Sequence, residues 1–149
     1  MTKYIEIKGH SIQATDTDPA LYAGAWSSGN TINTKRDAVG GSRGGTQTAT
    51  LIFGGQGATA QTALTEEYDG SSWSEEADLN TARRAGGGFG TTTASLFSGG
   101  VTDTSHLIST NAVESYNGSA WSETTEMGTP RYSGFNAGIA TAGIIASGI

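Results

Sequence analysis

The chain of 149 residues contains no cysteine, which excludes both a disulfide framework and a metal site built on thiolates. It contains two histidines, His10 and His106, and neither has a second histidine or a carboxylate at the spacing of metal ligands. We interpret both as exposed loop residues, so no bound metal is expected.

Positive charge is scarce. The chain has 8 Lys and Arg against 14 Asp and Glu, which gives a net charge of −6 and a pI of about 4.7. Surfaces that bind nucleic acid concentrate Lys and Arg, whereas the basic residues of this chain are scattered. Nucleic acid is therefore not an expected partner.

Apolar residues make up only 35 % of the chain, below the roughly 45–50 % of an average globular protein. The N-terminal residues MTKYIEIKGH lack the apolar core of a signal peptide. The longest apolar stretch, residues 137–149, is too short and too rich in glycine to span a bilayer. We expect a soluble protein that does not insert into membranes.

Glycine, by contrast, is abundant: 23 residues, about twice the usual share of ~7 %. Tryptophans 26, 73 and 121 each stand in a copy of the same phrase, at spacings of 47 and 48 residues. A fixed period of this size predicts a repeat architecture. Because the glycines recur at fixed places in the repeat, they indicate tight turns rather than a disordered linker.

The residue pattern of each repeat predicts about four short strands. No segment has helical periodicity. An arginine ends an N-T-x-R or G-T-P-R phrase in every copy: Arg36, Arg83 and Arg131. Strand-like segments rich in threonine and apolar residues then follow: 46–55, 91–100 and 139–148.

The second half of the repeat contains a variable loop and a hairpin. Tyr68 follows Gly55 by 13 positions, whereas Tyr116 follows Gly100 by 16. Because this connection varies in length, it is expected on one edge of the assembly. The Asx-Gly pairs 69–70 and 117–118 then predict hairpins with type I′ turns, which need positive φ at both central residues.

The glycine pairs 54–55 and 99–100, followed by a tyrosine and a tryptophan, resemble the kelch repeat of β-propellers. The resemblance covers residues 26–149 and implies one antiparallel four-stranded blade per repeat around a central axis. The tyrosine and tryptophan are five residues apart, closer than in the usual kelch phrase. The variant phrase T-E-E-Y-D-G-S-S-W is similar to kelch-like repeats in tail-fibre and other virion proteins of bacteriophages, which implies a viral structural protein.

We therefore divide the chain into an N-terminal arm, residues 1–25, and about 2.5 repeats of ~48 residues: 26–72, 73–120 and an incomplete 121–149. Alternation at Tyr4, Ile5 and Ile7 predicts a short strand in the arm. A closed propeller needs about four to eight blades, so either further residues follow or other chains complete the ring. The phage resemblance implies that the arm anchors to other virion proteins. It also implies that the chain forms a homo-oligomer, since phage appendages are commonly trimers.

Three acidic pairs invite a glycosidase or calcium interpretation: Asp16/Asp18, Glu66-Glu67 and Glu75-Glu76. Glycosidases use two carboxylates at a set separation, but adjacent strand residues point to opposite faces. Glu66 also aligns with Glu114, so it belongs to the repeat. We interpret these pairs as solvated charges, and the D-T-D segment lacks the glycine and distant glutamate of an EF-hand loop.

The glycine runs 40–45 and 85–90 precede strands rather than helices, so they are not nucleotide-binding loops. They are expected to let strands approach closely near the axis. The recurring arginines are expected to bridge to carbonyls or a carboxylate, with a ligand groove as the alternative. The recurring tryptophans are expected to pack between blades.

The sequence thus predicts an all-β, non-enzymatic virion component, a tail-fibre or adhesin part located on the phage particle. Its loops would meet a host-surface receptor or another virion protein. No catalytic, cofactor-binding or metal-binding residue is assigned. Two alternatives stay open: a carbohydrate-active propeller enzyme and a cellular kelch module for protein interaction.

Overall fold

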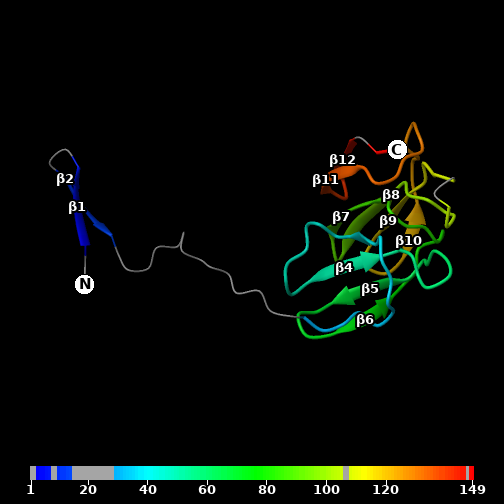
Figure 1. Cartoon of the computed structure of the whole chain (residues 1–149), viewed down its shortest axis with the longest axis horizontal. Coiled ribbons are helices and arrows are strands. Elements are labelled where there is room, and N and C mark those ends of the chain that lie inside the picture. The colour runs from blue at the N-terminus through cyan, green and yellow to red at the C-terminus, as the bar shows by residue number, and fades with distance from the viewer. Residues whose placement is uncertain (1–2, 8–9, 15–28, 106–107, 147) are drawn as a thin grey trace.

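The computed structural model describes residues 3–7, 10–14, 29–105, 108–146 and 148–149. All regular structure in this part of the chain is β, and every strand pair is antiparallel (Figure 1). None of it forms a helix long and apolar enough to cross a membrane. The strands are β1 (Lys3–Ile7), β2 (His10–Ala14), β3 (Gly40–Gly41), β4 (Thr50–Phe53), β5 (Thr65–Tyr68), β6 (Trp73–Glu76), β7 (Gly87–Thr91), β8 (Ala94–Ser98), β9 (Val113–Tyr116), β10 (Trp121–Glu123), β11 (Phe135–Ile139) and β12 (Ala142–Ala146).

The repeats form three successive sheets. The first sheet has the order β3-β4-β5-β6 and the second the order β7-β8-β9-β10, while the third contains β11 and β12. In the two complete sheets each strand pairs with its sequence neighbours. This confirms the prediction of antiparallel four-stranded sheets.

The sheets do not coincide with the repeat segments that run from one tryptophan to the next. The first sheet spans residues 40–76 and the second spans 87–123. Trp73 and Trp121 therefore lie on the last strand of a sheet and do not open the next one. Divisions at 73 and 121 separate each last strand from its own sheet.

The two predicted hairpins are present, but their turns are not type I′. Only the glycine of each Asx-Gly pair has positive φ, 94° at Gly70 and 92° at Gly118, whereas a type I′ turn needs two such residues. The Asx side chain stabilises the loop: Asp69 Oδ1 accepts from the amides of Ser71 and Ser72 at 2.7 Å each. Its repeat equivalent makes the same two bonds.

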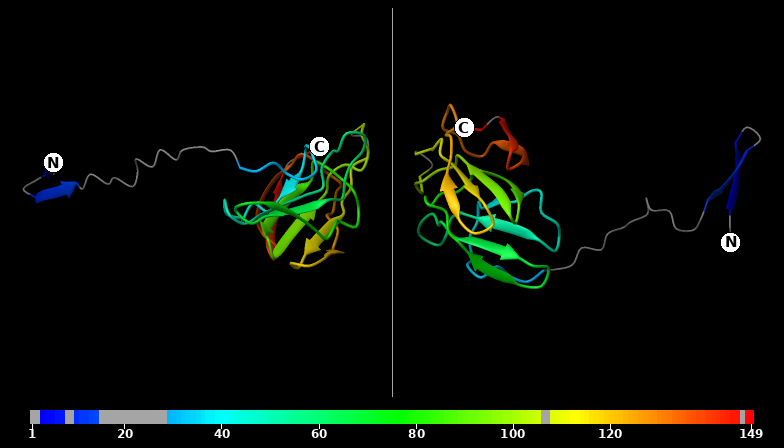
Figure 2. Two further views of the ribbon diagram at one scale, coloured as in Figure 1. Left: turned by 90° about the horizontal axis from the view of Figure 1, so that it is seen from below. Right: turned by 180° about the vertical axis from the view of Figure 1, so that it is seen from behind.

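The three sheets lie side by side in chain order (Figures 1 and 2). They come closest at their first strands, where β3 contacts β7 and β7 contacts β11. A Cβ atom at Gly88 would lie only 2.6 Å from the backbone nitrogen of Gly41. This confirms that the glycine runs allow close packing of neighbouring sheets.

A ladder of three equivalent residues also joins the sheets through the backbone. The amide of Ala85 donates to the carbonyl of Ala38, and the amide of Ser133 donates to Ala85, both at 2.8 Å. All three have positive φ, between 49° and 55°. Non-glycine residues rarely adopt this conformation, so its recurrence at one repeat position indicates that the ladder requires it.

The hydrophobic core lies between the first and second sheets. The Phe53 ring packs edge-to-face against Phe97, with centroids 5.2 Å apart, and against Trp121 at 4.8 Å. The indole Nε1 of Trp121 donates to Thr65 Oγ1 at 3.0 Å. Aromatic packing and this hydrogen bond therefore hold one sheet against the next.

Of the N-terminal arm, β1 contains Tyr4, Ile5 and Ile7, which confirms the predicted strand. The pairing of β1 with β2 was not predicted, and it places His10 in a strand, so the interpretation of His10 as a loop residue is wrong. The acidic pair 16/18, Trp26 and His106 lie outside the described residues.

Candidate functional site

The connections between strands divide into two edges. The loops that vary in length, 54–64 and 99–112, follow the second strand of each complete sheet. Because neighbouring strands are antiparallel, these loops and the connections between sheets lie on the same edge. We call these connections the loop edge; the short turns at 69–72, 92–93, 117–120 and 140–141 form the opposite turn edge.

A buried ion pair anchors the loop edge of the second sheet. The Arg83 side chain is 0 % exposed and pairs with Glu114, which is 1 % exposed. Its Nε donates to the carbonyl of Gly99 and its Nη2 to that of Phe97, both at 3.0 Å. Burial lowers the pKa of the Arg83 guanidinium, although Glu114 acts in the opposite direction. For Arg83 this confirms the structural role expected of the recurring arginines.

The first sheet repeats this arrangement at Glu66. Arg36 pairs with its carboxylate, and the amides of Asn33 and Thr34 donate to it at 2.7 and 3.3 Å. Burial alone would raise the pKa of Glu66, but these hydrogen bonds and the charge of Arg36 together lower it. The interpretation of Glu66 as a solvated charge is therefore wrong.

The same arginines join neighbouring sheets through the backbone. The amide of Gly55, at the end of the first sheet's second strand, donates to the carbonyl of Arg83 at 2.9 Å. Gly100 donates likewise to Arg131 at 2.9 Å. Arg83 thus binds the first sheet with its carbonyl and the second sheet with its guanidinium.

The other carboxylates of the first sheet lie in two environments. Glu75 is exposed, as expected. Glu67 and Glu76 face the second sheet, where Tyr116 Oη donates to Glu76 Oε2 at 3.5 Å. Burial and the charges of Glu76 and Asp69 raise the pKa of Glu67. Burial and nearby carboxylates raise the pKa of Tyr116 as well.

Glu67 and Tyr116 are the groups that most resemble an acid–base site, because burial and nearby carboxylates raise the pKa of both. They lie between two packed sheets rather than in a cleft. Across the described ranges, no group of three or more histidines and carboxylates could hold a metal ion.

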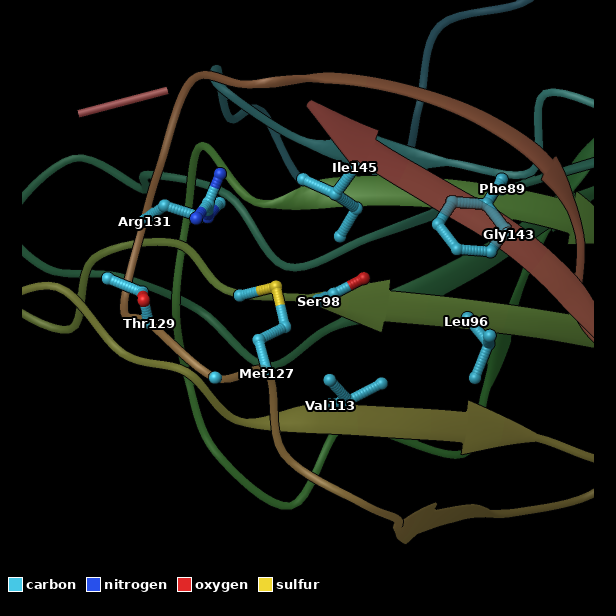
Figure 3. A pocket seen from close by; sticks show the side chains of 10 residues that line it. Phe89, Leu96, Ser98, Val113, Met127, Thr129, Arg131, Gly143 and Ile145 are labelled. Carbon is cyan, nitrogen blue, oxygen red and sulfur yellow. The ribbon is translucent and has the colours of Figure 1, made fainter. Parts of the chain in front are cut away.

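Two of the cavities among the described residues border the sheets and the loop edge. The larger, about 400 Å³, lies between the second and third sheets, and Leu96, Val113 and Met127 contribute to its wall (Figure 3). The smaller, about 320 Å³, lies on the loop edge beside Arg36 and Gln56.

Three side-chain atoms of the first variable loop are buried without a hydrogen-bond partner within the described part of the chain: Gln56 Oε1, Gln61 Nε2 and Thr62 Oγ1. Buried polar atoms are nearly always paired in proteins. The loop that varies between repeats therefore also carries hydrogen-bonding capacity that the sheets do not use.

The tryptophans differ in burial. Trp121 is 6 % exposed between the first two sheets, as expected. Trp73 is only half-buried and donates from Nε1 to the carbonyl of Asn30. The expectation that Trp73 packs between sheets is wrong, because no sheet among the described residues precedes the first one.

No protein-family model matches the chain, and no curated protein matches it at a significant level. Among solved structures, the chain is similar to that of YjhT, with a TM-score of 0.67 and 12 % identity. The match covers 81 % of this chain and 41 % of that one, so the chain spans less than half the length of YjhT. At this identity the similarity shows a shared fold over the matched stretch.

Proposed function

We propose that the chain is a non-enzymatic component of a bacteriophage virion, a tail-fibre or adhesin part built from kelch-like propeller blades. Its loop edge binds a host-surface receptor or another virion protein. The N-terminal arm, residues 1–25, attaches it to the particle, and it requires no cofactor. The kelch and phage assignments rest on the resemblance of the repeat phrases.

The observation that carries this proposal is the contrast between a constant scaffold and variable loops. The ion pair between an arginine and a glutamate recurs in both complete sheets, whereas the loops after the second strand differ in length by three residues and in sequence. Binding residues commonly lie on loops held by a rigid scaffold. The unpaired polar atoms of the loop at 56–62 support a binding role for the same edge.

The carboxylates give less support to an enzymatic function than the loops give to a binding function. Glu66 and Glu114 accept hydrogen bonds from an arginine and from backbone amides, so their carboxylate oxygens already hold the scaffold together. A carbohydrate-active enzyme would depend instead on Glu67, whose raised pKa suits a general acid. Loss of a measured glycosidase activity in Glu67→Gln would favour that alternative over the adhesin.

The virion assignment is tested first by gene context and then on particles. We expect capsid, portal or tail genes beside the gene for this chain, and immunogold labelling of the corresponding phage particles. A location among metabolic genes, with unlabelled particles, would contradict the proposal and favour a cellular kelch module.

The loop edge is tested by competition with phage adsorption to host cells. The purified chain should reduce adsorption, and Thr59→Arg in the first variable loop should weaken this effect. Thr93→Arg, in an exposed turn on the opposite edge, is the matched control and should compete as well as the unchanged chain. Equal loss in both variants would exclude a specific role for the loop edge.

A further inference from the structure

The turn between β9 and β10 contains Asn117, which alone among the asparagines of the chain is followed by glycine (Figure 1). Asparagine is chemically labile, and in this dipeptide it can lose its side-chain amide without an enzyme. The reason is that glycine has no side chain to obstruct its backbone nitrogen. Asn117 is also exposed, so water reaches it. The dipeptide is therefore a candidate site of self-modification.

The side-chain amide of Asn117 is folded back over the peptide that follows it. Its Oδ1 accepts hydrogen bonds from the backbone amides of Ser119 and Ala120, both at 2.9 Å. These amides lie two and three residues further along the chain. The two bonds therefore hold the Asn117 Cγ on the side of the backbone nitrogen of Gly118, which keeps the electrophile and the nucleophile close together.

The same two hydrogen bonds suit the charge that develops when these groups react. Attack of the Gly118 nitrogen on Cγ gathers negative charge on Oδ1 of Asn117. Backbone N–H groups at about 2.7–3.1 Å from a developing oxyanion stabilise it. The donors from Ser119 and Ala120, at 2.9 Å, lie within that range. The turn is thus arranged to lower the barrier to this attack.

The leaving nitrogen distinguishes Asn117 from the other asparagines. Within the described ranges, no protein group accepts a hydrogen bond from the Nδ2 of Asn117, whose recorded side-chain bonds are both to Oδ1. Every other asparagine donates from Nδ2 to a carbonyl or a carboxylate: Asn30, Asn33, Asn80, Asn111 and Asn136. The amide nitrogen that the reaction must release is therefore held by the fold at those five positions and not at Asn117.

The aspartate product already has a counterpart in the chain. The equivalent turn of the first sheet carries Asp69, which accepts hydrogen bonds from the amides of Ser72 and Ser71 at 2.7 Å each. These bonds lower the pKa of Asp69, so this turn favours a charged carboxylate. Aspartate at position 117 should accordingly fit the second turn without rearrangement.

We propose that Asn117-Gly118 is a self-modification site, at which the folded chain converts asparagine into aspartate and isoaspartate. The Gly118 nitrogen forms a bond to Cγ of Asn117 and gives up its proton. The Cγ–Nδ2 bond breaks, and the amide nitrogen leaves with that proton as ammonia. Water then opens the resulting cyclic imide. Opening at Cγ gives aspartate, whereas opening at the backbone carbonyl carbon gives isoaspartate.

The two products differ in their effect on the second sheet. Aspartate keeps the length of the loop, whereas isoaspartate adds a methylene carbon to the backbone between Tyr116 and Trp121. These two residues pair across the hairpin, and their rings lie 5.1 Å apart between centroids. Trp121 also packs on Phe53 of the first sheet. Isoaspartate at this turn therefore loosens the packing between the first two sheets as the protein ages.

Peptide mapping by mass spectrometry, after incubation of the purified chain in ¹⁸O-labelled water, tests the reaction. We expect one labelled oxygen in the peptide that contains Asn117, none at the other asparagines, and a faster reaction at higher pH, because Gly118 must lose a proton. The folded chain should react at least as fast as a synthetic peptide of residues 113–123. A slower reaction in the folded chain than in the peptide would overturn the proposal.

Two variants separate the role of the turn from that of the dipeptide. Asp69→Asn places asparagine and glycine in the equivalent turn and should create a second site that reacts at a similar rate. Ala112→Gly is the matched control, because it gives Asn111 a following glycine while Asn111 Nδ2 donates to Glu126 Oε2 at 2.9 Å. Asn111 should stay unmodified. Fast reaction at Asn111, or none at position 69, would contradict the proposal.

Thermal unfolding of the separated products tests the consequence. Each modified chain carries one more negative charge than the unmodified one, so ion exchange separates it, and an isoaspartate methyltransferase identifies the isoaspartate fraction. Asn117→Asp should unfold at the same temperature as the unchanged chain, whereas the isoaspartate fraction should unfold at a lower one. Equal midpoints for all three would contradict the loosened packing. The outcome does not depend on the phage assignment, since it measures a reaction of this chain alone.

Discussion

The buried guanidinium–carboxylate pair is the residue-level feature on which each complete sheet depends. A buried charge without its partner is costly, because the protein interior solvates it poorly. Arg83 and Glu114 satisfy each other and are also held by backbone groups on both sides. Two recurring residues of opposite charge in the repeat are the sequence signal for this pair, although the sequence does not show that it is buried.

Removing one charge of the pair should therefore destabilise the fold. We expect Glu114→Gln to lower the free energy of unfolding by about 3–5 kcal/mol, because it leaves Arg83 buried without a counter-charge. Glu75→Gln, at an exposed position, is the control and should change it by less than about 0.5 kcal/mol. Urea denaturation measures both, and equal small effects would contradict the structural role of the pair.

Glu66 and Glu67 should respond to pH in opposite ways. The folded-state pKa of Glu67 is raised above its ordinary value of 4.5, so its charge costs stability at neutral pH and the cost disappears on acidification. Glu67→Gln should thus be more stable than the unchanged chain at pH 7 and equal to it below pH 4.5. A stability difference that does not change between pH 7 and pH 4 would contradict this.

The folded-state pKa of Glu66 is lowered from 4.5. Its contribution is therefore present above that pH and is lost as the pH falls through the folded-state value. Denaturation curves of the Glu67→Gln variant should accordingly show a steeper loss of stability below pH 4.5 than between pH 7 and 4.5. A loss confined to the range above pH 4.5 would count against the ion pair with Arg36.

At the scale of elements, the first strands of the sheets require glycine where their backbones meet. A Cβ at Gly88 would lie 2.6 Å from Gly41 N, so Gly88→Ala should destabilise the fold by about 1–3 kcal/mol through overpacking. Gly128 has nothing within 4 Å of its Cβ position, and Gly128→Ala is the matched control. Thermal unfolding of the two variants should separate them, and identical midpoints would contradict the close packing.

The two tryptophans on last strands should differ in their effect on stability. Trp121→Ala removes the ring that packs on Phe53 and should cost about 3–5 kcal/mol. Trp73→Ala should cost less at concentrations where the protein is monomeric, because Trp73 is only half-buried. A larger loss for Trp73 in denaturation experiments would mean that a further segment covers the first sheet.

The elements also show what a sequence of this kind can and cannot reveal. The hairpins were predictable because Asx-Gly pairs between a tyrosine and a tryptophan determine the turn locally. The turn type was not, because the Asp69 carboxylate bonds to amides of the loop and so removes the need for a second positive φ. The burial of a tryptophan depends on whether a sheet precedes it, which no local pattern contains.

At the scale of the whole molecule, the repeats form two four-stranded sheets, β3–β6 and β7–β10, followed among the described residues by the two-stranded sheet of β11 and β12. Packing through the first strands explains why the sheets come together at glycine-rich segments. Antiparallel pairing within each sheet explains why the variable loops share one edge.

Neighbouring sheets pack side by side through their glycine-rich first strands, and nuclear Overhauser contacts in purified residues 1–149 test this most directly. We predict contacts between β3 and β7 and between β7 and β11. Intact strand pairs within each sheet, without contacts between these first strands, would contradict the packing.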